Sequence, residues 1–513
     1  MSTSTRPEGQ RSFDQPVPRP ESATGAPSAA DGYNHSQILV IMSGLMLGMF
    51  LAALDQTIVT TALTRISEDF HQLNLYSWVV TSYLLTSTVT TPLYGKISDM
   101  FGRKAIFQFA IVLFLAGSAL SGMSDSMLQL ILFRGVQGLG GGGLFSVALS
   151  IVGDVIPPRD RGRYQGYFGG VFGIASIIGP LIGGFLVDEA SWRWVFYVNL
   201  PIGVVALVVI NRVLHNDRRR SQSSIDFGGA ILSVGGVAML LVAAQSIGQY
   251  AKFTSLAAVT APIGLVMLVA FVWWETRAAA PILPLRMFRN GVFSVSSALS
   301  LITGAVMFGA IIFLPEYLQI VRHVSPTMSG LRLLALLVGL LFTSIGSGQL
   351  ISRWGRYKVF VVSGTAIMAV GMWLMSLIEI NTGSIALYAM MFVVGAGLGL
   401  FMQTLVLATQ NSIAPQDMGV GTSAITFFRT LGGAIGAAVL GAVVLDQEKV
   451  LSRADVARFG KVSGAAHAFV TGMDRAFLWS VPIAVVAFAL SFLLKEIKLR
   501  TSAPGPVHAQ AAG

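Results

Sequence analysis

The sequence predicts an all-α integral membrane protein of fourteen spans, built as two six-helix halves plus two additional central helices. Two observations support this fold class. Hydrophobic residues make up 54% of the 513 residues and charged residues only 11%, whereas soluble proteins carry about 25% charged residues. The chain also contains fourteen apolar stretches of about the 20 residues that a helix needs to cross the hydrocarbon core.

The apolar stretches follow one another with polar segments between them, and we number them as the first to fourteenth predicted spans. Glycine and proline within a stretch do not argue against a membrane helix, because small residues let such helices approach closely. The predicted spans lie near 38–62, 76–94, 105–123, 127–149, 164–187, 194–214, 227–248, 254–274, 292–318, 328–350, 358–379, 384–407, 421–445 and 476–494. The segment 446–475 is predicted as the longest outer loop, mixed in charge and partly ordered.

Composition and a weak internal repeat divide the chain into two halves, a linker and two tails. The stretch GKISDMFGRK (95–104) follows the second span and GQLISRWGRYK (348–358) follows the tenth, which favours two corresponding halves. The Pro- and Ser-rich N-terminus has too few aliphatic residues to fold. The predicted parts are a disordered cytoplasmic tail (1–36), an N-terminal half (37–215), a linker with two additional helices (216–280), a C-terminal half (281–500) and a second cytoplasmic tail (501–513).

The basic residues predict the orientation of the spans. Most of the 34 Lys and Arg fall on alternate connecting segments, and cytoplasmic loops carry such an excess. We therefore expect a multi-pass protein of the cytoplasmic (inner) membrane with both termini in the cytoplasm. This arrangement explains the net charge of +10 without a nucleic-acid partner, and the lack of cysteine excludes disulfides and thiolate metal sites.

One carboxylate stands out inside the first span, in LAALDQTIVTTAL (51–63). Asp55 lies about 26 Å along the helix from Ile38, past the middle of the span. Low dielectric disfavours an ionised carboxylate, so we expect Asp55 to be neutral when it faces the proton-rich exterior and ionised when it faces the cytoplasm. It would couple transport to protons and bind cationic substrate. The alternative is a packing role, with Asp55 held by Thr57 or a neighbouring helix.

The fourth span contains an arginine, in LILFRGVQGLGGGG (130–143). A charge at that depth is costly, so Arg134 should face the bundle interior and a polar partner. Gln137 lies on the same helical face. We predict that Arg134 takes part in proton coupling and that Gln137 contacts substrate. The alternative is that Arg134 only ties helices together through backbone carbonyls.

Two further stretches predict conformational roles. In GKISDMFGRK we expect a tight turn, with Gly95 and Gly102 allowing close backbone approach, Asp99 capping the following helix, and Arg103 and Lys104 at the lipid headgroups. The alternative is a loop that merely follows the inside-positive bias. The fifth span carries a face of small residues and a proline that predicts a kink: Gly179, Pro180, Gly183 and Gly184.

Weaker signals come from the second half. Glu316, in IFLPEYLQIV (312–321), adds a carboxylate in or near the transport path, with predicted roles in proton coupling and substrate binding, or else lies at the outer rim. Gln403 is a predicted substrate contact in an otherwise apolar span. Arg332 and Arg429 are predicted to be helix-packing or rim residues.

These stretches resemble the signature motifs of the major facilitator superfamily: the loop motif after the second helix, the arginine motif of the fourth and the Gly-Pro antiporter motif of the fifth. LDQTIVTTAL, WRWVFYVNLPIG (192–203) and RTLGGAIGAAVL (429–440) resemble motifs of its fourteen-helix drug:proton antiporter branch. The resemblance covers about 37–500 and implies a monomer with the major facilitator fold. Two departures are Thr64, where the family often has proline, and Glu316, where an apolar residue is common.

We therefore expect a proton-coupled secondary active transporter that exports amphipathic small molecules (drugs, antiseptics or antibiotics) by alternating access. The alternative is an exporter of a lipid, fatty acid or endogenous metabolite. Enzyme activity, a cofactor and a metal are not expected, because no span pairs His with carboxylates and GLGGGG lacks the Lys-Ser/Thr of a phosphate loop. The expected partners are the substrate, protons and the lipid bilayer. A sensor or scaffold role would leave Asp55 and Arg134 unexplained.

Overall fold

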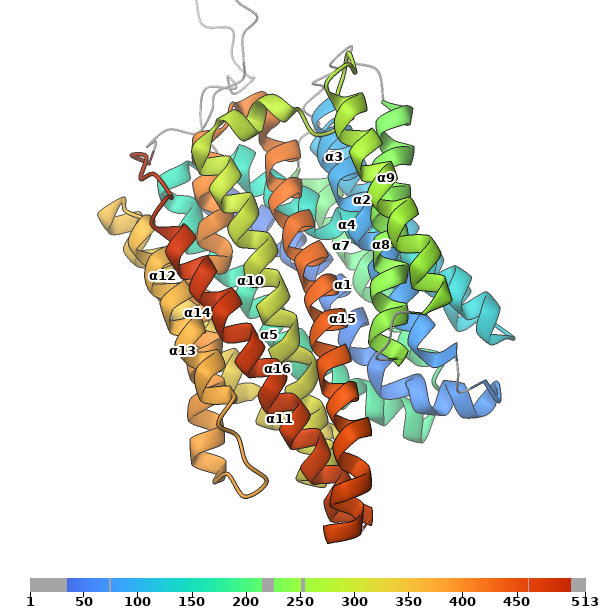
Figure 1. Ribbon diagram of the computed structural model, residues 1–513. Helices are drawn as coiled ribbons and strands as arrows, with labels where there is room; N and C mark the ends of the chain where they lie inside the picture. Colours follow the sequence, from blue (N-terminus) through green and yellow to red (C-terminus); the bar gives the residue numbers. More distant parts are fainter. Residues whose placement is uncertain (1–34, 73–74, 215–225, 251–253, 460, 500–513) are drawn as a thin grey trace, which may run out of the picture. The chain divides into compact units, whose positions relative to one another are not determined.

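The computed structural model describes residues 35–72, 75–214, 226–250, 254–459 and 461–499, and within these ranges the chain is helical and contains no strand. Figure 1 shows the helices in the order of the chain. Their bounds are α1 His35–Asp69, α2 Tyr76–Phe101, α3 Arg103–Gly122, α4 Met127–Val155, α5 Pro158–Glu189, α6 Trp194–Tyr197, α7 Asn199–Val213, α8 Phe227–Tyr250, α9 Ser255–Glu275, α10 Gly291–Glu316, α11 Pro326–Arg332, α12 Leu334–Trp354, α13 Lys358–Met375, α14 Ser384–Ser412, α15 Met418–Phe459 and α16 Lys461–Ser491. Both predicted tails lie outside the described residues, apart from the last residues of 1–36.

Each of the fourteen predicted spans coincides with a helix, the sixth with α6 and α7 together and the tenth with α11 and α12 together. Over the described residues, ten helices are long and apolar enough to cross a bilayer, and shorter apolar helices cover Phe227–Ala243 and Gly291–Met307. The all-helical membrane fold is thus confirmed. The count of fourteen crossings stays a prediction.

The helices differ from the predicted spans at their polar ends. The segment 446–475, predicted as a loop, continues α15 to Phe459 and begins α16 at Lys461. Hydropathy detects only the part of a helix that lies in hydrocarbon, and 446–459 contains no Gly or Pro to end the helix. The predicted tight turn is likewise mostly helix. It is reduced to Gly102, whose φ of 96° favours glycine.

Consecutive helices run back and forth, so that two ends of the bundle can be distinguished. α2, α4 and α14 finish, and α3, α5 and α15 begin, at what we call the α2–α3 end. The C-terminal end of α16 lies there too, at the top of Figure 1, whereas the junction of α15 and α16 lies at the bottom, at the opposite end. Hydrogen bonds bind the segment after α16 to this end: Tyr357 N donates to Glu496 Oε1 (2.7 Å) and Asn411 Nδ2 donates to Ile497 O (3.3 Å).

Of the pair α8 and α9, it is α8 that packs on helices from both predicted halves. Val237 and Leu241 of α8 share a buried cluster with Val89 of α2 and Leu431 of α15. Van der Waals packing among these side chains stabilises the contact of α8 with both helices. The first of the two helices between the predicted halves, α8, therefore lines the seam where α2 meets α15.

Candidate functional site

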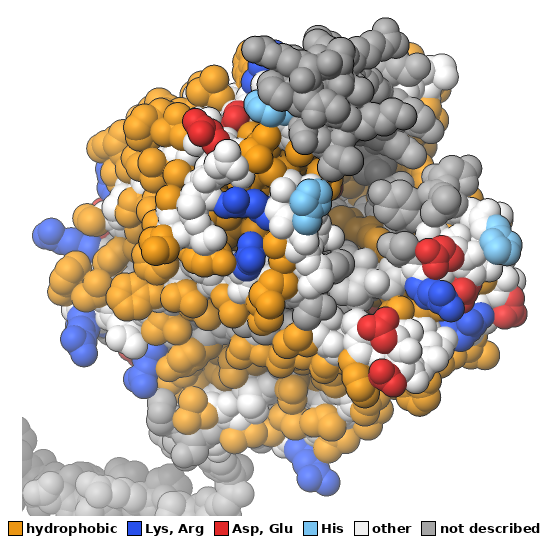
Figure 2. Space-filling model, turned by 90° about the horizontal axis from the view of Figure 1, so that it is seen from below, with side chains coloured by type: hydrophobic (Ala, Val, Ile, Leu, Met, Phe, Trp, Pro, Cys, Tyr) orange, Lys and Arg blue, Asp and Glu red, His pale blue; other side chains and the backbone are white. Residues whose placement is uncertain are grey.

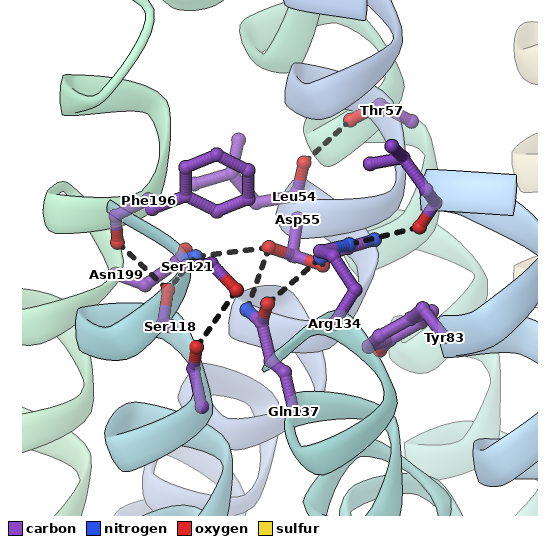
Figure 3. Close-up of polar contacts among 12 residues, drawn as sticks. Leu54, Asp55, Thr57, Tyr83, Ser118, Ser121, Arg134, Gln137, Phe196 and Asn199 are labelled. Atoms are coloured by element: carbon purple, nitrogen blue, oxygen red, sulfur yellow. Dashed lines mark hydrogen bonds and ion pairs between the residues drawn. The ribbon is translucent and has the colours of Figure 1, made fainter. Parts of the chain in front are cut away.

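The Asp55 carboxylate is the centre of a buried polar network (Figure 3). Asp55, on α1, has no exposed surface. Arg134 of α4 forms an ion pair with it, Nη1 lying 2.5 Å from Oδ2. The other oxygen, Oδ1, accepts hydrogen bonds from Gln137 Nε2 (2.8 Å) and Asn199 Nδ2 (3.1 Å). One carboxylate therefore links α1 to α4 and α7, and it accepts hydrogen bonds from three side chains.

Arg134 uses its remaining donors on the same network. Its side chain is 1% exposed, and Nε donates to Val79 O of α2 (3.2 Å) while Nη1 also donates to Gln137 Oε1 (2.8 Å). Its guanidinium carbon lies 4.5 Å from the centroid of the Tyr83 ring, within cation–π range. Arg134 therefore pairs with a carboxylate and also ties α4 to a backbone carbonyl of α2, while its role in proton coupling stays a prediction.

Asn199 was not identified as a site residue from the sequence. Its amide bridges Asp55 and Ser118 Oγ of α3 (3.0 Å), and the Ser118 hydroxyl donates to Phe196 O (2.8 Å). The available signal was a buried asparagine within WRWVFYVNLPIG, a stretch already singled out for its resemblance. Its partner could not be predicted, because nothing in the sequence indicates that α7 faces Asp55.

The alternative packing role for Asp55 named Thr57 or a neighbouring helix as its partner, and the contacts of Asp55 are with neighbouring helices and not with Thr57. The Thr57 hydroxyl donates to Leu54 O and to Ala175 O of α5, both at 3.0 Å. A buried ion pair must offset the desolvation of two charges. Here the compensation comes from Arg134 and two amides rather than from a hydroxyl of the same helix.

The small residues of α5 pack against the same helix, α1. A Cβ at Gly179 would overlap the Thr57 side chain, and a Cβ at Gly183 would overlap the side chain of Thr61. Pro180 lies beside Gly330 of α11, where a Cβ would be 3.5 Å from it. Gly184 is half-buried. Gly179 and Gly183 thus permit the close approach of α5 to α1 one helical turn beyond Asp55.

At the α2–α3 end, a charged cluster joins helices of both predicted halves. Arg103 pairs with Asp99 (2.5 Å) and with Asp154 of α4 (2.9 Å). The Asp99 carboxylate accepts backbone N–H bonds from Gly419 (3.2 Å) and Val420 (3.1 Å) at the start of α15. A carboxylate at a helix N-terminus satisfies orphan N–H groups and complements the helix dipole.

Two predictions about this cluster were wrong. Asp99 caps α15 and not the helix that follows it, because it lies in the last turn of α2, facing α15. Arg103 is 13% exposed between two carboxylates and does not lie at the headgroups. Lys104 donates to Asn211 O at the end of α7 (2.8 Å). Sequence proximity suggested lipid as the partner of these cations, whereas the fold supplies protein partners.

Burial raises the pKa of the Asp99 carboxyl to about 6, opposed by Arg103 and reinforced by Asp154. Asp99 lies beyond the apolar part of α2. Close packing accompanies this burial, because a Cβ at Gly95 would stand 2.6 Å from Gly419 O. The predicted close approach at Gly95 is therefore a contact of α2 with α15.

Other contacts between the predicted halves lie at the same end. Arg159 Nε donates to Ser352 O (3.0 Å), and Gln410 Nε2 donates to Leu149 O (3.0 Å). A Cβ at Gly162 would stand 2.9 Å from the carbonyl oxygen of Gly348. The described helices of the two halves are thus fastened together at the α2–α3 end.

The remaining predicted site residues lie elsewhere. Glu316 is exposed at the last residue of α10 and takes no part in the contacts described for Asp55. Gln403 is half-buried on α14 and lines a small cavity with Ser344 and Thr404. Arg332 and Arg429 are half-buried. The structure therefore brings together Asp55, Arg134 and Gln137, but not Glu316 or Gln403.

Figure 2 shows the face at the opposite end of the bundle. Hydrophobic side chains cover much of its outline; charged side chains of both signs lie on its right side, and further ones are scattered over the rest of the face. Among the residues that the structure describes, no group of three or more His, Asp or Glu side chains could hold a metal ion.

Comparisons with known proteins agree with this architecture. The family model of the Major Facilitator Superfamily matches residues 45–437. An uncharacterized MFS-type transporter of Mycobacterium tuberculosis is 39% identical over 479 residues, covering 90% of this chain and 70% of that protein. The multidrug transporter protein MdtP of Bacillus subtilis is 37% identical over 410 residues, covering 80% of this chain and 76% of that protein. The proton:xylose symporter XylE has a similar fold, with a TM-score of 0.64 at 15% identity over 91% of this chain and 98% of that one. The chain is therefore a membrane transporter that belongs to the Major Facilitator Superfamily.

Proposed function

We propose that this transporter exports amphipathic small molecules, cationic or neutral, in exchange for protons. The observation that carries the proposal is the buried Asp55 carboxylate held by Arg134, Gln137 and Asn199. It is supported by the similarity to MdtP, whose name describes a multidrug transporter. An ionisable group inside a membrane helix bundle commonly belongs to an ion or proton pathway.

In the proposed orientation, the protein lies in the inner membrane and its α2–α3 end faces the cytoplasm. The helix ends and connecting segments at this end carry clusters of basic residues, among them Arg159, Arg163, Arg353, Arg356 and Lys358. Cytoplasmic loops are enriched in Lys and Arg. The state described here, fastened at that end, would then be closed toward the cytoplasm.

The proposed mechanism uses the charge balance of the ion pair. Ionised Asp55 neutralises Arg134, so the network carries no net charge. When a proton from the exterior neutralises Asp55, Arg134 keeps its charge without a compensating carboxylate. The uncompensated cation repels cationic cargo toward the exterior and weakens the link of α1 to α4. Release of the proton to the cytoplasm restores the pair and readies the site for the next cargo.

Alternating access requires that the contacts at the α2–α3 end open and close. We propose that Asp99, Arg103, Gly95 and Gly102 form the closing contact of α2 with α15. The α1–α5 contact at Gly179 and Gly183 would transmit changes at Asp55 to α5. In turn, α5 contacts the other half where its Gly162 lies against Gly348 of α12.

The test is transport of ethidium into inside-out proteoliposomes under an imposed pH gradient. Wild type should accumulate the dye, and an ionophore that collapses the gradient should abolish accumulation. Asp55→Asn keeps the size of the side chain but cannot take up a proton, and its NH2 group cannot accept the bonds that a carboxylate oxygen accepts, so we expect dye accumulation to be lost. Gradient-driven accumulation by Asp55→Asn at the wild-type rate would exclude the proposed role. Movement of labelled fatty acid or phospholipid, but of no dye, would instead favour lipid export.

A further inference from the structure

A small polar cavity lies between the predicted halves, apart from the Asp55 network. Its wall combines Gly162 of α5 with residues of α12 and α14. The polar or close-packed residues on the α12 and α14 side are Ser344, Ser347, Gly348, Gln403 and Thr404. Because helices of both halves line it, the cavity must change shape when these helices move apart.

Two polar atoms in this wall lack a partner among the described residues. Ser344 is 3% exposed, and its Oγ has no hydrogen-bond partner; nor has the buried Oε1 of Gln403. The neighbouring hydroxyls, in contrast, have hydrogen-bond partners. The Ser347 hydroxyl donates to Ser344 O (3.1 Å), and the Thr404 hydroxyl donates to Leu400 O (2.6 Å). Burying an unpaired polar group costs free energy, so a ligand that paired with both atoms would be favoured here.

The chemistry of the wall defines the ligand. An amide oxygen only accepts hydrogen bonds, whereas a serine hydroxyl both donates and accepts. The lining contains no charged side chain. The matching ligand is therefore a neutral group that donates a hydrogen bond to Gln403 Oε1, such as a hydroxyl or an amide N–H.

α5 controls access to these atoms. A Cβ at Gly169 of α5 would stand 3.4 Å from Ser344 Oγ, so α5 covers the hydroxyl directly. Nearer the start of α5, the backbones of Gly162 and of Gly348 on α12 are in contact. Separation of α5 from α12 at the α2–α3 end would expose both polar atoms together.

We propose that Ser344 and Gln403 form a subsite for a hydroxyl or amide N–H group of the transported molecule, reached when α5 parts from α12. The assignment rests on the proposed export function, because cargo enters at the end where this seam lies. It adds a selectivity that the Asp55 network does not provide. Asp55 responds to charge, whereas this subsite distinguishes neutral cargoes by their hydrogen-bond donors.

The test uses two neutral fluorescent probes that differ in one group: N-methyl-dansylaminohexanol and its O-methyl ether. Binding to the purified full chain is measured by dansyl fluorescence, and export is measured in proteoliposomes with and without a pH gradient. Wild type should bind the alcohol about fivefold to tenfold more tightly than the ether, the range of one neutral hydrogen bond. Gln403→Met should remove this preference and leave the affinity for the ether unchanged, because only the alcohol can donate to Oε1. Ser344→Ala should weaken the binding of both probes, because the serine hydroxyl can donate to either oxygen.

Ser352→Ala is the matched control, because its hydroxyl on the same helix is already bonded to Gly348 O (3.0 Å) and does not line the cavity. It should keep the wild-type preference. A wild-type protein that shows no preference, or a preference that Gln403→Met retains, overturns the subsite. Equal weakening of both probes by Gln403→Met also overturns it, since that side chain would then serve packing alone. Failure of the proposed function appears separately, as binding with the predicted preference but export that ignores the gradient.

Discussion

At the scale of single residues, the Asp55–Arg134 pair determines how the site behaves. Two opposite charges that are 0% and 1% exposed are costly to desolvate, and replacing both with neutral groups is often tolerated. Removing one partner is not, because the other charge stays buried without compensation. The pair is therefore expected to be strongly coupled, in stability as well as in transport.

This coupling predicts an asymmetric mutational result. Arg134→Gln should destabilise the protein by about 3–5 kcal/mol, because Asp55 loses its cation. Adding Asp55→Asn to this variant should restore most of the loss, since no buried charge remains. Unfolding in mixed micelles with increasing sodium dodecyl sulfate would measure both values. If the double variant is no more stable than Arg134→Gln, the two residues are not coupled as described.

At the scale of helices, the start of α15 against the end of α2 is the contact with a built-in pH response. The Asp99 carboxyl is 14% exposed and accepts two N–H bonds from α15. Burial raises its pKa to about 6, whereas an open conformation would return the pKa toward the ordinary aspartate value of 3.8. The closed contact therefore holds a proton more tightly than the open one.

The sign of the pH dependence follows from this difference. A raised pKa adds stability to the closed contact that is fully present below about pH 4 and is lost as the pH rises through about 6. Between pH 5 and pH 7.5 the ratio of closed to open molecules should fall by about tenfold. With spin labels at the exposed positions Phe101 and Gln416, double electron–electron resonance spectroscopy would measure the distance between α2 and the start of α15.

Asp99→Asn provides the control, because the amide cannot titrate in this range. Its distance distribution should be the same at both pH values. A pH response that persists in Asp99→Asn, or that closes the contact as the pH rises, would rule out the carboxyl as its origin.

At the scale of the whole molecule, much of the architecture could be predicted from the sequence because a bilayer imposes length and apolarity on each helix. The fourteen apolar stretches all fall on helices. What hydropathy cannot detect is how far a helix continues into the polar region, so the continuation of α15 to Phe459 was missed. The same limit hid the helical character of GKISDMFGRK.

The site could be predicted only in part, for a related reason. A charged residue in an apolar stretch is visible in the sequence, which is how Asp55 and Arg134 were identified. Its partner depends on how helices face one another, and so the contacts of Asn199 with Asp55 and of Asp99 with α15 were not predicted. Glu316 was visible in the same way, but the structure places it at an exposed helix end.

The transport cycle that we propose links these scales through one event, the exchange of a proton for cargo at Asp55. The most direct measurement is proton release when ethidium binds to the purified protein in lightly buffered detergent solution containing a pH indicator. Wild type should release protons in proportion to the dye bound. The variant Glu316→Gln, which removes an exposed carboxyl, tests whether a second carboxylate contributes to this release. Asp55→Asn should bind ethidium and release none. Proton release by Asp55→Asn equal to that of wild type would contradict the account.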